Sequence, residues 1–548
     1  MNGQRRNARS RRVPVSFLFL SILLLVMAAC GSTGTTPAAS GTPGLAASQV
    51  LTFPNVGIAD AASLDPATGP DANTAQAVGM IYSGLVRSDA NLGVIADQAT
   101  WDVSPDSTVY TFHLKAGIKF SDGTPVTAQT YVYTLTRQLL PAVNSPIATF
   151  FESNIKGASA VASGKTKTLA GVQALDSQTL QITLTRPTPY FLEEMTNSLY
   201  YPLNENMINK YGQTQWGNNA VGPGFGTGPF MLKAWDHHVK MVLVPNPYYY
   251  GPRTKLTEVD MLFVSDPGTA YRSFEAKQYD FVWNIPADEQ AQAQSMPGFV
   301  RKPLLQSDLL FFDNAKPPFN NLAVRQAFAY ATNKQLLVSA VFKNTVVAAQ
   351  TIIPPGMPGY QPNYPGIPYN PAMAKSLLQS VYPNASKVPP IVFSYPSSQV
   401  SENEAAALQQ MWQSALGIQV TLHPEELSTY NNDTANFKIQ FGFTQWSADF
   451  PDPYDWLTLN LTTNAPNNNG RWSNAQFDQL TTQAEQATGS ARIALYNQAE
   501  DIAIQQVGWL PLDHEAMAAI IPPYIHGLIL NGNGLYFGDW SGVYIAQH

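Results

Sequence analysis

Residues 446–457 read Trp-Ser-Ala-Asp-Phe-Pro-Asp-Pro-Tyr-Asp-Trp-Leu, and they follow an alternating apolar run, Phe437, Ile439, Phe441 and Phe443. Apolar residues at every second position are typical of a strand that buries one face. A carboxylate-bearing loop just past the carboxyl end of a strand is a frequent ligand site in α/β proteins. This stretch therefore predicts an α/β fold and a candidate binding site in its acidic loop.

The three carboxylates of this loop have different local environments. Asp452 precedes Pro453 and is placed to cap a helix that starts at this proline. Asp455 would then fall in the first helical turn, where a negative charge suits the helix dipole. Asp449 has no such local role, so we take it as the leading ligand-binding candidate. The alternatives for Asp449 are a solvated loop carboxylate and an ion pair with a distant arginine.

Length and charge limit the class of protein. A chain of 548 residues exceeds a single ordinary core, so we expect about two or three lobes. The formal net charge is −7, and it becomes −12 when residues 1–29, with five arginines and no acids, are removed. An acidic surface argues against nucleic acid as a partner.

The amino terminus has the pattern of an export signal. Five arginines precede an apolar segment, 13–27, that is short for a membrane span, and small residues lead to Cys30, the only cysteine. This pattern resembles a bacterial lipoprotein signal, which implies a lipid anchor at Cys30; ordinary secretion with cleavage elsewhere is the alternative. Residues 30–48 are rich in Gly, Ser, Thr, Pro and Ala and predict a flexible tether.

Local patterns predict alternating strands and helices in the second half of the chain. We expect helix caps at Thr127 and Asn333. Ser401-x-x-Glu404 is a capping-box pattern that predicts a helix over 405–416, ended by Gly417. The expected strands include 50–53, 109–114, 391–395 and 418–422. Strand–helix–strand alternation indicates an α/β lobe.

A series of short motifs, in order along nearly the whole mature chain, resembles the peptide/nickel-type solute-binding proteins of ABC importers (family 5), most closely the oligopeptide-binding members. They are Ser-Leu-Asp-Pro (63–66), Tyr-Thr-Phe-His-Leu-Lys-Ala-Gly-Ile-Lys-Phe-Ser-Asp-Gly-Thr-Pro-Val-Thr (110–127), Gly-Thr-Gly-Pro-Phe (226–230), Asn-Pro-Tyr-Tyr-Tyr-Gly (246–251), Lys-Pro-Pro-Phe-Asn-Asn-Leu-Ala-Val-Arg (316–325) and Leu-Gly-Ile-Gln-Val (416–420). Together they are specific for the family, although no single motif would be.

The resemblance implies a periplasmic-binding protein type II fold with two lobes, a hinge and an extra third domain. We expect a signal peptide over 1–29, a tether over 30–48, and a discontinuous lobe I from 49–82, 205–305 and 517–548. The extra domain would be 83–204 and lobe II 306–516, entered and left through two hinge strands.

The resemblance also implies a site. Asp449 matches the carboxylate that pairs with the α-ammonium of a bound peptide. A carboxylate in a closed cleft would recognise that charge strongly. The backbone of Gln445, Trp446 and Ser447 would pair with the peptide backbone, which is blind to side chains. Trp446 would wall a side-chain pocket, or it could simply pack in the core.

Two departures from the family pattern concern the far end of the ligand. Basic groups that meet a short peptide's carboxyl end in the family correspond to Phe443 and, roughly, Ser401, and neither is basic. Carboxylate capture and a strict tripeptide length are therefore not implied. Asp-His-Glu at 513–515 replaces a tyrosine-rich stretch, so His514 and Glu515 could add polar or acidic contacts that favour cationic ligands, or form a solvated turn.

We therefore expect a monomeric, exported, lipid-anchored receptor that closes around an oligopeptide and delivers it to an ABC permease. We expect no cofactor, no metal and no catalytic activity, since the sequence has neither Gly-x-Ser-x-Gly nor His-Glu-x-x-His. The alternatives are the same fold binding another solute (a nickel chelate, an oligosaccharide or an antibiotic peptide), a sensor that docks on a signalling receptor, and a secreted hydrolase.

Overall fold

The first sheet is built on β1 (Val50–Val56), in which Leu51 and Phe53 are fully buried. The structure is a computed structural model, and it describes residues 44–68, 74–534 and 539–548. Strand β1 pairs in parallel with β10 (Glu258–Val264), and the strand order is β1-β10-β9-β8, with β9 at Lys240–Pro245 and β8 at Phe230–Asp236. The nearby helices are α1 (Thr74–Ile81), α6 (Glu205–Tyr211), α7 (Pro267–Glu275) and α8 (Ala287–Ala293).

A second, antiparallel sheet lies between these segments in the sequence. Its order is β4-β5-β7-β6, and the strands are β4 (Ala99–Val103), β5 (Val109–Leu114), β6 (Val172–Ala174) and β7 (Thr179–Thr183). The alternating residues Tyr110, Phe112 and Leu114 are buried, as the sequence pattern predicts for a half-buried strand. The hairpin β2 (Val86–Ser88) and β3 (Val94–Ala96) precedes it, and helices α2 (Ala128–Gln138), α3 (Ala148–Phe151), α4 (Ala158–Ala162) and α5 (Phe191–Glu194) accompany it.

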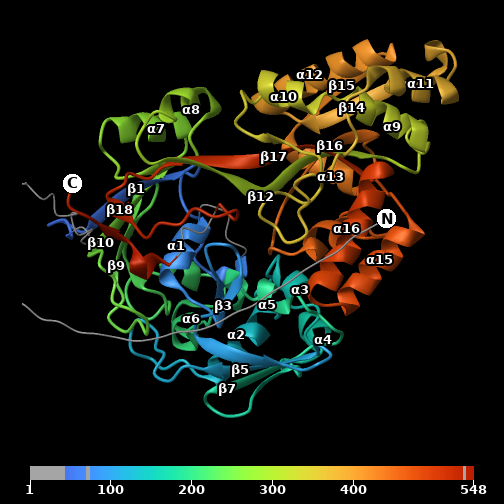
Figure 1. Ribbon diagram of the computed structural model, residues 1–548. Helices are drawn as coiled ribbons and strands as arrows, with labels where there is room; N and C mark the ends of the chain where they lie inside the picture. The colour runs from blue at the N-terminus through green and yellow to red at the C-terminus, as the bar shows by residue number, and fades with distance from the viewer. Residues whose placement is uncertain (1–43, 69–73, 535–538) are drawn as a thin grey trace, which may run out of the picture. The chain divides into compact units, whose positions relative to one another are not determined.

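The third sheet contains the two longest described strands, β12 (Phe299–Phe312) and β17 (Trp509–Ile520), which pair antiparallel and run side by side in Figure 1. The order is β11-β17-β12-β16-β14-β15, with β13 (Val347–Ala348) also on β17. The other strands are β11 (Val282–Trp283), β14 (Ile391–Pro396), β15 (Val420–Glu425) and β16 (Phe441–Ser447). A separate pair is β18 (Ile525–His526) with β19 (Tyr544–Ile545).

Helices and an aromatic cluster hold β16 in place. Phe441 is fully buried, and its ring stacks on Phe312 at 5.5 Å and on Phe393 at 4.8 Å between centroids. Truncating one such buried ring to alanine costs about 3–5 kcal/mol of stability. The surrounding helices are α9 (Leu322–Ala331), α10 (Lys334–Ala340), α11 (Pro371–Val381), α12 (Gln399–Leu416), α13 (Leu427–Ala435), α14 (Leu459–Leu461), α15 (Ala475–Gln486) and α16 (Gly489–Gln505).

The α/β fold and most predicted elements are confirmed, but several element boundaries are wrong; β15, for example, spans Val420–Glu425 and not 418–422. Helix α12 begins earlier than the capping-box pattern indicates, because the Ser398 hydroxyl caps it by accepting from the Ser401 N–H at 3.1 Å. Strand β16 begins only at Phe441, because Phe437 adopts a φ of 55° in a turn and is 40% exposed. The caps predicted at Thr127 and Asn333 do precede α2 and α10.

Each predicted lobe range contains most of one of these sheets, although β11 of the third sheet lies in the lobe I range and the hinge strands run between ranges. The range 83–204 contains the second sheet, and β12 and β17 cross the limits proposed near 305 and 517. These domain boundaries stay a prediction. Among the described residues, no helix combines the length and the apolar composition needed to cross a membrane. The proposed signal, Cys30 and most of the tether lie outside the described residues.

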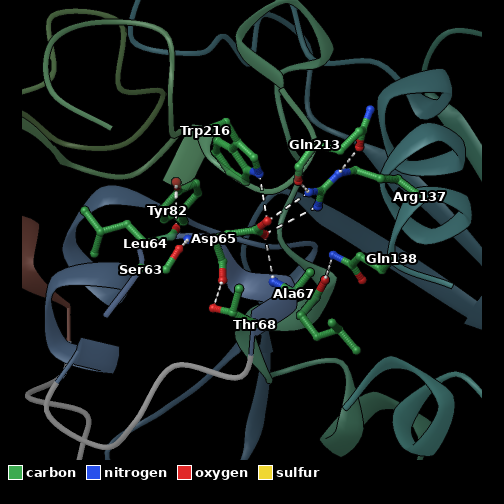
Figure 2. A network of polar contacts seen from close by, with 11 residues as sticks. Ser63, Leu64, Asp65, Ala67, Thr68, Tyr82, Arg137, Gln138, Gln213 and Trp216 are labelled. Carbon is green, nitrogen blue, oxygen red and sulfur yellow. Dashed lines mark hydrogen bonds and ion pairs between the residues drawn. The ribbon is translucent and has the colours of Figure 1, made fainter. Parts of the chain in front are cut away.

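Asp65, from the Ser-Leu-Asp-Pro motif, joins the first sheet to the helix α2 region (Figure 2). Its carboxylate pairs with Arg137 of α2 at 2.8 Å, and it accepts from the Trp216 indole N–H at 2.7 Å and from the Ala67 N–H at 2.9 Å. Arg137 also donates to the carbonyl of Gln213 at 2.6 Å. Asp65 and Arg137 are both buried, so these additional hydrogen bonds are needed to offset the cost of removing the two charges from water.

We predict that Asp65→Ala destabilises the protein strongly, because Arg137 would remain buried without its carboxylate partner. Removing one member of a buried ion pair costs about 3–5 kcal/mol. The measurement is the thermal unfolding midpoint. Asp288→Ala is the control, since Asp288 pairs with Lys343 at the surface. Equal midpoints for the two variants would contradict a stabilising role for Asp65.

Candidate functional site

Strand β16 has one paired edge and one open edge at its carboxyl end. On the β12 side the register places Gln445 opposite Asp308 and Ser447 opposite Gln306. On the other side β14 pairs with β16 only as far as Gly442, and the Tyr430 hydroxyl donates to the carbonyl of Phe443 at 2.5 Å. Among the described residues, no backbone partner follows on that side of β16.

The register also decides which backbone groups face the open edge. Ala448 donates its N–H to Leu305, so this pair is hydrogen-bonded across β12 and β16. Hydrogen-bonded and non-hydrogen-bonded pairs alternate in an antiparallel ladder. The Trp446 backbone therefore faces β12, whereas the N–H and C=O groups of Gln445 and Ser447 face the open edge. These two residues are able to pair with an extended ligand.

The side chains of Gln445 and Ser447 are engaged within the sheet. Gln445 donates to the Asp308 carboxylate at 2.7 Å, and the Ser447 hydroxyl donates to the Gln306 side-chain carbonyl at 2.9 Å. Their backbone groups, and not these side chains, are thus the available part of the strand.

Asp449 lies just beyond β16 and is held by Asp455. The Asp449 N–H donates to the Asp455 carboxylate at 3.0 Å, and the Trp446 indole N–H donates to the same oxygen at 3.3 Å. The Asp449 carboxylate itself has no hydrogen bond or ion pair among the described residues, and it is solvent-accessible. Surrounding protein nevertheless desolvates it and raises its pKa to about 6.

The other two carboxylates of the loop differ in part from the helix-start interpretation. Asp452 does accept from the Tyr454 N–H at 2.8 Å, but it also forms a buried, bidentate ion pair with Arg492. Asp455 is fully buried in a single π-helical turn, Tyr454–Thr458, and its side chain points back to Asp449 and Trp446. Burial, followed by the Asp449 charge, raises the Asp455 pKa well above its ordinary value. Asp455 does lie in the first helical turn, as predicted, but its side chain positions the loop by accepting from Asp449 and Trp446.

His514 is not placed where it could contact a ligand, so we leave it out of the proposed site. Its ring is 1% exposed, with Nδ1 2.7 Å from the Ser307 hydroxyl and Nε2 3.3 Å from the Thr351 hydroxyl. Burial, assisted by Lys334, lowers its pKa to about 3, so it is neutral. Neither is it in a solvated turn, because it belongs to β17.

Two cavities flank the open end of β16. The first, of about 630 Å³, is lined by Gln445, Phe443, Ser401 and Glu515, together with Asp308 and Glu404. The second, of about 520 Å³, is lined by Ser447 and Glu515 and by residues of the predicted lobe I, including Val56 of β1 and Gly532. Glu515 lines both cavities. Trp446 is half-buried against the core, and its role as a pocket wall stays a prediction.

Sequence reasoning missed two further carboxyl groups beside Glu515, namely Asp308 and Glu404, whereas Asp513 belongs to the Asp-His-Glu stretch singled out from the sequence. One oxygen each of Asp308, Asp513 and Glu515 lies within 4.8 Å of the others, a grouping that could hold a metal ion. The available signal was Asp308, which is the one acid in β12 and directly precedes the apolar run Leu309–Phe312. Glu404 carried no such signal, because its helix position indicates only a cap.

We predict that Asp455→Ala releases the Asp449 loop, whereas Asp455→Asn retains it. Asparagine has the shape of the neutral carboxylic acid that burial favours, and its oxygen can still accept from Asp449. Hydrogen exchange of the Asp449 amide should accelerate about five- to tenfold in Asp455→Ala, as expected when a hydrogen bond worth about 1–1.5 kcal/mol is lost. Asp478→Ala, which removes the acceptor of the Thr463 N–H, is the control. Unchanged exchange in Asp455→Ala would refute the positioning role.

Comparisons with known proteins agree with this architecture. Residues 94–468 match the family described as bacterial extracellular solute-binding proteins, family 5 Middle. The chain is 32% identical over 518 residues to the probable deoxycholate-binding periplasmic protein YgiS of Escherichia coli strain K12, covering 92% of this chain and 95% of that protein. It is 29% identical over 535 residues to the oligopeptide-binding protein OppA of Bacillus subtilis strain 168, covering 94% and 97%.

The fold is shared with solved structures. The unliganded open form of the periplasmic murein tripeptide-binding protein MppA superposes with a TM-score of 0.81 at 28% identity, covering 93% of this chain and 99% of that one. The family that residues 94–468 match is, by its description, one of solute-binding proteins. The chain therefore belongs to the family 5 bacterial extracellular solute-binding proteins and has their type II periplasmic-binding fold.

Proposed function

We propose that this chain is the monomeric, extracytoplasmic receptor of an ABC importer, and that it captures oligopeptides by their amino end. The observation that carries the proposal is the open edge of β16 beside the unpaired carboxylate of Asp449. A peptide laid along this edge could exchange backbone hydrogen bonds with Gln445 and Ser447 without any requirement on its side chains.

The amino end of such a peptide would pair with Asp449. A hydrogen bond between two charged groups contributes about 1.5–3 kcal/mol, more than a neutral one. The names of two relatives support a peptide ligand, since one is called oligopeptide-binding and the other murein tripeptide-binding. The Asp449 loop is already held by Asp455, so little ordering would be needed when the ligand arrives.

Closure around the ligand would use the strands that join the lobes. The second cavity is lined by residues of the predicted lobe I and of the predicted lobe II. A ligand bound there would contact both lobes and stabilise the closed state. Lipidation at Cys30 would keep the receptor at the outer face of the membrane, near its permease. Mass measurement of the mature amino terminus, with Cys30→Ser as the unlipidated control, tests this anchor.

A bile acid is the second candidate ligand, because one relative is a probable deoxycholate-binding protein. Deoxycholate carries a carboxylate. Asp449 lies near one end of the open edge, and Asp308, Glu404 and Glu515 line the first cavity. An anion would be repelled by this arrangement, so we favour the peptide.

We predict that Asp449→Asn weakens binding of peptides with a free amino end by about 10- to 100-fold, because a charge-assisted hydrogen bond is lost. Isothermal titration calorimetry with a mixture of tripeptides to pentapeptides measures the change. Amino-acetylated peptides should bind the wild type weakly and respond little to the substitution. Asp236→Asn, at an exposed carboxylate that ends β8, is the control.

Equal affinity in wild type and Asp449→Asn would remove Asp449 from the site. Binding of deoxycholate without binding of any peptide would overturn the peptide proposal in favour of the second candidate.

The affinity of the wild type should also depend on pH in a defined direction. Because the pKa of Asp449 is raised to about 6, a proton occupies it below that pH and must leave before an ammonium group binds. Affinity should fall up to tenfold per pH unit below about 6, and fall again above about 8 as the peptide's α-amino group loses its proton. In Asp449→Asn the acid-side fall should disappear; its persistence would assign the titration to another group.

A further inference from the structure

We propose that the first cavity is a binding site for a cationic group of the ligand, a primary ammonium or a guanidinium, held by Asp308, Glu404 and Glu515 with Asp513 behind them. This inference rests on the proposed function and specifies the ligand. The cavity would therefore prefer a positive group, whereas a site for the carboxylate end of a peptide would have to prefer a negative one.

The cavity walls are acidic on one side. Asp308 of β12, Asp513 and Glu515 of β17 bring carboxylate oxygens within 4.8 Å of one another. None of the described residues that line the cavity is Lys, Arg or His. Burial raises the pKa of Asp308 to about 6 and that of Glu515 to about 7, and it raises that of Asp513 well above its ordinary value. Repulsion from the Asp308 charge adds to the shift at Glu515 and at Asp513.

Glu404 provides an independent observation from a different element. It projects from α12 and lines the cavity, although it is only 5% exposed, and its Oε1 has no hydrogen-bond partner among the described residues. Leaving a buried polar atom unpaired costs about 1–3 kcal/mol. A cationic donor in the cavity would satisfy this oxygen and relieve the repulsion among the four carboxyl groups.

The size and the other walls of the cavity favour an organic cation over a bare metal ion. A volume of about 630 Å³ is far larger than an ion and is typical of a small-molecule pocket. Phe342, Phe443 and Tyr430 supply apolar surface that could pack against the methylene groups of a lysine or arginine side chain.

The cavity is reached from the edge on which the ligand would lie. Gln445 lines the cavity and its side chain donates to Asp308, so a side chain leaving the peptide beside Gln445 would enter near the acids. Gln445 and Asp449 are separated by four positions, or roughly 13 Å of extended chain. A basic side chain within about the first four residues of the ligand would therefore reach the cavity.

The test uses the mature protein and tetra-alanine peptides in which lysine or norleucine replaces one residue in turn. We expect lysine to bind at least tenfold more tightly than norleucine at one internal position. In Glu404→Gln that ratio should fall toward one, whereas Glu402→Gln, an exposed carboxylate on the same helix, should leave it unchanged. Asp513→Asn is the second variant and should act in the same direction as Glu404→Gln.

The variants should fold, because an amide replaces a carboxyl group whose charged form is disfavoured by burial. Raised folded-state pKa values mean that the free energy of unfolding falls as pH rises through them. The thermal midpoint of Glu404→Gln should therefore be at least as high as that of the wild type at pH 8.

Several outcomes separate this inference from the function on which it rests. Peptides that bind without any lysine preference would overturn the cation site and leave the peptide receptor intact. If no peptide binds, 1,5-diaminopentane is the remaining probe, and it must raise the thermal midpoint of the wild type but not of Glu404→Gln. Stabilisation by Ca²⁺ or Mn²⁺ alone would identify a metal site instead and overturn the proposal.

Discussion

The interruption in the pairing of β12 with β17 is the constraint on which the site depends. The ladder is regular to Pro303, which lies opposite Ala516, and it resumes only at Ser307, opposite His514. Leu305, in the interruption, exchanges its backbone bonds elsewhere: it donates to Gly532 and accepts from Ala448. A bulge of this kind frees backbone groups and bends a strand. Here the backbone of Leu305 connects Gly532, in the predicted lobe I, with Ala448, next to Asp449. This connection lies where β12 passes from one predicted lobe to the other.

The same loop is supported from behind by the range 83–204. Tyr190 stacks on Phe450 at 5.6 Å and on Tyr454 at 4.2 Å between ring centroids, and Arg186 donates to the Tyr454 hydroxyl at 2.9 Å. Stacked aromatic pairs contribute about 0.5–1.5 kcal/mol each beyond the burial of their area. The candidate binding loop is therefore packed between two parts of the chain that are distant in sequence, which limits how far Asp449 can move.

The sequence predicted those features that depend on neighbouring residues, together with the family's motif order. The α/β fold, most strands and the isolation of Asp449 from local roles follow from alternation, proline and capping patterns. Two features depend on packing between separate elements, and no local sequence pattern encodes such packing. They are the contact of Asp455 with Trp446 and the grouping of Glu404 with Asp308 and Glu515 around one cavity. The predicted start of α12 was wrong because Ser398 and Ser401 are both suitable caps, and tertiary packing selects Ser398. The Ser-Leu-Asp-Pro motif is one of the set that together resembles the family, but only the buried contact of Asp65 with Arg137 explains its chemistry.

The combination of a sequence-blind strand edge with a charged cavity shows how one fold can serve different solutes. Backbone pairing at Gln445 and Ser447 would accept any extended peptide, and it supplies affinity without discrimination. Discrimination must come from groups whose desolvation is costly, because an unsuitable ligand leaves those groups uncompensated. Phe443 and Ser401 offer no positive charge to a carboxylate, while Asp308, Glu404 and Glu515 lie beside them with raised pKa values. The carboxyl groups would repel an anionic end of a ligand in this cavity. A cation would instead be attracted to them, and the repulsion among the carboxyl groups would decrease on binding.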